Sequence, residues 1–208
     1  MNLNRTLIAV SISAALIHLT AAASQADMMT YNGVGLNQTV RIHHPDRTVR
    51  VKAGFMNLTY QDVTFDSFCV EVTANAGSSE VTERPLSGLA NGDLVACLWE
   101  THFDEADTSL EAAALQVAIW ELTHEATQDF DAAEGSFYIT DNAAVAAQAN
   151  VWLDALQDDY TPKNVFKVLH SSGRQDMLLA TGVSVPEPAA LTTTLLGAVG
   201  FLLRRRYA

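Results

Sequence analysis

Apolar and polar residues alternate in the first part of the chain, as they do in β-strands. Every second residue is apolar in the segments 38–42 and 48–53, and His44-Pro45-Asp46 between them is typical of a hairpin turn. The segment 65–72 alternates as well, and it puts Cys69 on the face opposite its large apolar residues. The pattern therefore predicts three strands before residue 73.

The second part changes to helical spacing. Thr108 and Glu111 form a capping box, which predicts a helix that runs to about Ala126. Its core stripe is Leu115, Ala118, Ile119 and Leu122. A second helix is expected at 141–157, and two returning strands at 163–169 and 177–180, joined by a turn at 171–173. This order predicts an α+β domain, with an antiparallel β-sandwich or barrel-like sheet and an inserted two-helix segment.

The first 26 residues have the features of a secretory signal peptide. Arg5 supplies the positive charge, residues 7–19 are mostly apolar, and Ser24-Gln25-Ala26 offers small residues for cleavage before Asp27. We therefore expect an exported protein whose mature domain spans residues 27–183.

The residues from 184 to 208 form a second targeting segment. Pro186-Glu187-Pro188 precedes an apolar stretch at 189–203, which is shorter than the roughly 20 residues of a comfortable transmembrane helix. Arg204, Arg205 and Arg206 follow, and such a cluster holds the end of a helix on the cytoplasmic side.

These three parts in this order resemble a PEP-CTERM sorting signal. The resemblance implies an exosortase as processing partner, a C-terminal hydrophobic sorting helix that anchors the protein in the inner membrane before cleavage, and delivery to the cell surface or an exopolysaccharide matrix.

Composition narrows the classes of function. The 208 residues are enough for one domain, and 24 acidic residues against 12 basic ones give a formal net charge of −12. Nucleic acid is not an expected partner, because phosphate binding needs a basic face. By the same argument, an acidic surface repels anionic polysaccharide unless a cation bridges the two.

Motifs for catalysis are missing from the sequence. It has no glycine-rich phosphate loop, no Gly-x-Ser-x-Gly and no His-Glu-x-x-His. His43-His44 beside Asp46 and the pair Glu121 and His124 lack the further ligands that a metal site needs. We therefore expect no enzyme, no cofactor and no metal.

Cys69 and Gln116 are the candidates for chemistry. Cys69 lies in Phe-Cys-Val-Glu, and Gln116 begins Gln-Val-Ala-Ile-Trp within the apolar part of the predicted helix. A buried amide needs a hydrogen-bond partner, because leaving it without one costs about 1–3 kcal/mol.

The two motifs resemble those of bacterial thioester domains, although Leu115 stands where that family usually has Thr. The resemblance implies a covalent Cys69–Gln116 cross-link. A surface amine or hydroxyl of a matrix or host molecule would open it, which would make the protein a covalent adhesin.

Other interpretations of the pair stay open. Export places the two cysteines in an oxidising compartment, where Cys69 and Cys97 could form a disulfide. Both could instead be buried apolar residues, with Gln116 on the helix surface. The protein would then be a non-covalent structural or matrix-binding module. Asp66 and Glu71 flank Cys69, and if they are near in space they raise the pKa of its thiol.

Overall fold

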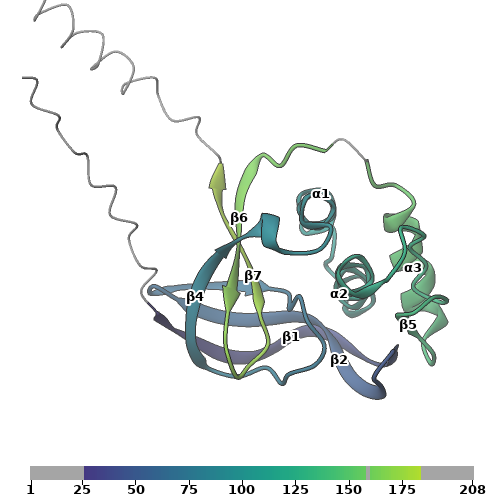
Figure 1. Cartoon of the computed structure of the whole chain (residues 1–208), viewed down its shortest axis with the longest axis horizontal. Helices are drawn as coiled ribbons and strands as arrows, with labels where there is room; N and C mark the ends of the chain where they lie inside the picture. The colour runs from purple at the N-terminus through teal and green to yellow at the C-terminus, as the bar shows by residue number, and fades with distance from the viewer. Residues whose placement is uncertain (1–25, 158–159, 184–208) are drawn as a thin grey trace, which may run out of the picture.

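The computed structural model describes residues 26–157 and 160–183, and these form one α+β domain (Figure 1). Its sheet is antiparallel, in the order β3-β2-β1-β4-β6-β7, and β5 pairs separately with β1. The strands are β1 (Asp27–His44), β2 (Arg47–Tyr60), β3 (Val63–Ser67), β4 (Ser79–Pro85), β5 (Tyr138–Ile139), β6 (Asn164–His170) and β7 (Met177–Val183). The helices are α1 (Gly92–His102), α2 (Ser109–His124), α3 (Ala143–Leu153) and the short 3-10 helix η1 (Leu86–Gly88). The predicted signal peptide and sorting tail lie outside the described residues, apart from Ala26.

The predicted hairpin is confirmed, and its strands are longer than the alternating segments. β1 and β2 pair from Met29 opposite Tyr60 to His44 opposite Arg47, with two register shifts. Gly54 is needed at one of these shifts, because its φ is +145° and a Cβ there would lie 2.1 Å from the Leu36 carbonyl oxygen.

The third predicted strand is only partly right. β3 ends at Ser67, where the chain leaves β2 and reaches β7 at the other end of the sheet. The backbone N–H of Leu178 donates to the Phe68 carbonyl at 2.9 Å, and that of Val70 donates to the Asp176 carbonyl at 3.0 Å. These bonds nearly close the sheet, so residues 68–70 belong to the seam between its two ends.

The helix at the capping box is confirmed, and α2 is the central helix of the domain. The Thr108 side chain accepts from the Glu111 backbone N–H, and the Glu111 side chain accepts from the Thr108 backbone N–H. Every residue from 112 to 122 is buried, because α2 packs on β1 and β2 while α1 and α3 cover its other sides. Figure 1 shows the three helices gathered on one side of the sheet.

The expectation of two inserted helices is wrong, since the described residues hold three α-helices between β4 and β6. The missed helix is α1. Its N-cap, Asn91, has a left-handed backbone with φ of 50° and makes no side-chain capping bond, and Asn91-Gly92 is a dipeptide that indicates a turn. The other predicted helix and the two returning strands are confirmed as α3, β6 and β7.

Candidate functional site

The seam of the sheet determines how Cys69 is presented. Cys69 lies opposite Met177 in an antiparallel bridge, and the hydrogen bonds to β7 are made by its two neighbours, Phe68 and Val70. In such a pair the N–H and the carbonyl of the central residue point away from the partner strand. The peptide groups of Cys69 therefore point away from β7 and need a partner on their other side.

Gln116 supplies that partner from α2. The backbone N–H of Cys69 donates to Gln116 Oε1 at 3.1 Å, and Gln116 Nε2 donates to the Cys69 carbonyl at 2.8 Å. The side-chain amide thus pairs with Cys69 as the peptide group of a neighbouring strand would. This pairing also defines which amide atom is oxygen, because a backbone N–H can only donate and a carbonyl can only accept. Both residues have an exposed fraction of 0%.

The sulfur of Cys69 lies beside the same amide, with Sγ 3.3 Å from Gln116 Oε1. Burial raises the pKa of the Cys69 thiol to about 12, while the indole N–H of Trp120 and the Cys69 backbone N–H oppose the rise. Of the two flanking carboxylates, Glu71 adds to the increase in pKa, and Asp66 is not among its causes. In the resting protein the group is therefore a neutral thiol.

Trp120 lies one helical turn after Gln116 and is 1% exposed. Its indole nitrogen is buried and has no hydrogen-bond acceptor among the described residues. The same N–H favours the thiolate form of Cys69. It is therefore a donor without an acceptor, placed where negative charge would develop if the thiol reacted. Trp120 does not stand out in the sequence, because a tryptophan in an apolar helix is typical of a core.

This arrangement has the components of an acyl transfer within the protein. The thiol is close to the side-chain carbonyl, and the Cys69 backbone N–H already polarises the oxygen on which charge would build up. The amide is held at both ends, so the two reacting groups start in a fixed orientation. Proximity and preorganised donors are what a poor electrophile such as an amide needs.

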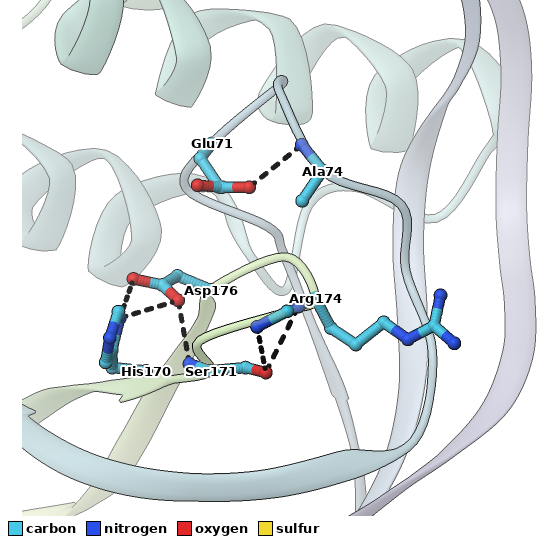
Figure 2. A network of polar contacts seen from close by, with 7 residues as sticks. Glu71, Ala74, His170, Ser171, Arg174 and Asp176 are labelled. Atoms are coloured by element: carbon cyan, nitrogen blue, oxygen red, sulfur yellow. Dashed lines mark hydrogen bonds and ion pairs between the residues drawn. The ribbon is translucent and has the colours of Figure 1, made fainter.

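The loops that follow Cys69 and precede β7 are fastened by a polar network (Figure 2). Asp176 accepts from the Ser171 backbone N–H and lies 2.8 Å from His170 Nδ1. Glu71 accepts from the Ala74 backbone N–H, and the Gln175 side chain donates to the Glu71 carbonyl. These bonds fix both chain segments at the seam and so maintain the position of Cys69.

Cys97 and the sorting residues are the other residues that the sequence singled out. Cys97 is buried on α1, and both cysteines are free, so the structure does not contain the alternative Cys69–Cys97 disulfide. Gln116 is buried and not on the helix surface, which corrects that alternative as well. The sorting residues Pro186, Glu187, Pro188, Arg204, Arg205 and Arg206 lie outside the described residues.

Protein-family models, curated proteins and solved structures were each compared with the chain, and none of them matches it. In the described part of the chain, no helix has the length and apolar character needed to cross a membrane. Residues 26–157 and 160–183 also contain no group of three or more His, Cys, Asp or Glu residues that could hold a metal ion.

Proposed function

We propose that this protein attaches covalently to other molecules through an internal thioester between Cys69 and Gln116. The observation that supports this most directly is the mutual pairing of the two residues, with Sγ 3.3 Å from the amide oxygen and both peptide groups of Cys69 bound to the amide. The protein is then a single-use acylating agent, because each molecule has one thioester.

The atoms balance without a co-reactant. Sγ attacks the side-chain carbonyl carbon of Gln116, and the negative charge moves to Oε1, where the Cys69 backbone N–H stabilises it. The thiol proton passes to Nε2, the C–N bond breaks, and ammonia leaves. An amine or hydroxyl later attacks the same carbon, the C–S bond breaks, and Cys69 leaves as a thiolate that takes up the proton of the attacking group.

A purely structural pairing would use the same two hydrogen bonds to the Cys69 backbone, and two further features support chemistry. The sulfur lies against the amide oxygen and not against an apolar wall. In addition, the buried Trp120 indole N–H has no acceptor among the described residues, and it favours the thiolate form of Cys69. Both features are explained if charge develops on the sulfur and oxygen during a reaction.

The site of action follows from the two ends of the chain. The signal peptide would export the protein, and an exosortase would process the Pro-Glu-Pro segment after the C-terminal helix has held the protein at the inner membrane. The domain would then stand at the cell surface or in the extracellular matrix, where amines and hydroxyls of matrix or host molecules are available to the thioester.

The test is the intact mass of the purified protein before and after methylamine. We expect a mass short by one ammonia, which rises by one methylamine mapped to Gln116. Cys69→Ala should have the full mass and no reaction with methylamine, whereas the matched variant Cys97→Ala should behave as the parent does.

A full mass in the parent protein would contradict the thioester, and the protein would become a non-covalent structural or matrix-binding module with free cysteines. A mass short by two hydrogens, restored by reductant and by Cys97→Ala, would identify a Cys69–Cys97 disulfide in that module.

A further inference from the structure

A cavity of about 260 Å³ is lined by Trp120, one helical turn after Gln116, and by several basic residues. Arg47, Arg50 and Lys52 from β2 line it, together with Tyr31, Gln175 and Trp120. No aspartate or glutamate is among the described residues that line the cavity. This is unexpected in a chain with a net charge of −12.

Several contacts connect the cavity to the reacting pair. Trp120 lines the cavity, and its indole N–H also favours the thiolate of Cys69. Arg47 donates to the carbonyl of Val72, three residues after Cys69, and Val72 is itself part of the lining. Burial, and then the charge that Cys69 takes when it ionises, raise the pKa of Tyr31, which also lines the cavity. The cavity and the pair therefore share Trp120 as a common boundary.

The basic side chains are accessible to a ligand, and Arg47 also donates to the Val72 carbonyl. Arg47, Arg50 and Lys52 are all exposed. Arg50 has one acidic neighbour, Asp141, at 3.8 Å, which is a weak surface contact. Two arginines and a lysine among the lining residues supply guanidinium and ammonium donors, which bind a carboxylate or a phosphate.

We propose that this cavity binds an anionic group of the acyl acceptor and thereby selects a hydroxyl on an acidic molecule, such as an acidic sugar, as the nucleophile for Gln116. The proposal rests on the thioester described above and names its substrate class. Protonated amines, such as the side chain of lysine, are repelled by the same three cations. The acidic surface as a whole repels anions, so the cavity directs them to one place.

The covalent step is an acyl transfer from the Cys69 sulfur to the hydroxyl oxygen of the acceptor. The acceptor hydroxyl oxygen attacks the acyl carbon of Gln116, the C–S bond breaks, and the hydroxyl proton passes to the Cys69 thiolate. The product is an ester between the Gln116 side chain and the acceptor, with Cys69 as a free thiol. Cys69 and Gln116 have no exposed surface, so the fold has to open locally before the acceptor reaches the acyl carbon.

Three sugars with the same ring hydroxyls and different charges test the proposal. Thioester-bearing protein is incubated with glucose, glucuronate or glucose 6-phosphate at equal ionic strength, and ester formation at Gln116 is followed by intact mass. We expect at least one of the anionic sugars to react about tenfold faster than glucose. The comparison of glucuronate with glucose 6-phosphate shows whether a carboxylate or a phosphate is preferred.

Lys52→Glu is the test variant, and Lys163→Glu is its control, since both lysines are exposed and Lys163 does not line the cavity. Lys52→Glu should lower the preference for the anionic sugar about fivefold or more, and Lys163→Glu should retain it. Equal rates for the three sugars, or equal effects of the two variants, would overturn the proposal.

A binding measurement separates this proposal from the thioester. Cys69→Ala cannot form a thioester, and the same sugars are titrated into it while the indole N–H resonance of Trp120 is followed by NMR. Saturable shifts with an anionic sugar and not with glucose support the anion site even if the parent protein has its full mass. No shift with either anionic sugar overturns the anion site even if the mass shows a thioester.

Discussion

Replacing Trp120 with Phe should slow thioester formation strongly and change stability little. The substitution keeps an aromatic ring in the core and removes the indole N–H, which has no acceptor among the described residues. A structural tryptophan would lose stability and keep the rate. Loss of a donor that acts on the reacting atoms would slow the reaction and leave the stability nearly unchanged, so the two roles predict opposite results.

The magnitudes follow from the surroundings of the indole. Removing a buried donor that has no partner raises the free energy of unfolding by about 1–3 kcal/mol. The smaller phenyl ring leaves a void, which lowers it by about 1 kcal/mol for each methyl-sized space. These effects nearly cancel, so the free energy of unfolding should stay within about 2 kcal/mol of the parent value. Loss of one donor to a developing negative charge slows a reaction by about 10²–10³-fold.

The assay starts from protein whose thioester has been opened by ammonia, which is the reverse of thioester formation. Ammonium at high concentration opens the thioester and regenerates the Cys69 thiol and the Gln116 amide. Ammonium is then removed rapidly, and the loss of one ammonia is followed by intact mass over time. Stability is measured in parallel by urea unfolding in the Cys69→Ala background, where the covalent link cannot contribute.

Trp152→Phe is the matched control, because Trp152 is also buried, at 6% exposure, and lies on α3. It should re-form the thioester at the parent rate. If Trp120→Phe re-forms the thioester as fast as Trp152→Phe does, the indole N–H has no part in the reaction, and the role assigned to it is wrong.

Three further predictions concern stability. Burial raises the pKa of the Glu121 carboxyl from 4.5 to about 8, so between these values the folded state binds a proton that the unfolded state does not. The free energy of unfolding therefore falls as pH rises from 4.5 to 8. Glu121→Gln should remove this decrease when urea unfolding is compared at about pH 5 and about pH 9. Burial opposes ionisation of Glu125, but hydrogen-bond donors from Phe137 and Ser136 outweigh burial and lower its pKa to about 2. The ionised carboxylate therefore stabilises the fold, and this contribution is lost as pH falls from 4.5 to 2. Glu125→Gln should lower the free energy of unfolding by about 1–3 kcal/mol at pH 7 and by less at pH 2, as measured by urea unfolding. Gly54→Ala should lower the free energy of unfolding by about 2 kcal/mol or more, because its Cβ would meet the Leu36 carbonyl, whereas Gly88→Ala, where a Cβ meets nothing within 4 Å, should cost little.

What could be predicted from the sequence is what neighbouring residues decide. The turn after His44 and the capping box at Thr108 are local, so both are visible in the chain. α1 is not visible in the sequence because it begins at Asn91-Gly92, a dipeptide that indicates a turn. β3 was predicted too long because alternation does not show that the chain changes partner after Ser67.

The candidate site was found only in part for the same reason. Cys69 and Gln116 stood out by residue type and by a resemblance, and the structure places them in contact. The basic cavity is assembled from β1, β2, α2 and two loops, and no segment of the sequence contains more than a part of it. Arg50 and Lys52 alternate with apolar residues along β2, which on its own indicates the solvent face of a strand, and Arg47 belongs to the opposite face.

The two hydrogen bonds that join Cys69 to Gln116 have a consequence for the thioester itself. When ammonia leaves, the Cys69 carbonyl loses its donor, Gln116 Nε2, and a buried carbonyl without a partner costs about 1–3 kcal/mol. The new link joins positions 47 residues apart, and a cross-link over such a loop stabilises by about 4 kcal/mol in the chain-entropy description. The thioester form should therefore be more stable by about 1–3 kcal/mol. Urea unfolding of thioester protein in sodium salt, against ammonia-opened protein kept in ammonium salt of equal ionic strength, measures this difference. Cys69→Ala should unfold alike in the two salts. Equal stability of the two parent forms would mean that the lost donor cancels the link, and a less stable thioester form would show that the fold is strained by it.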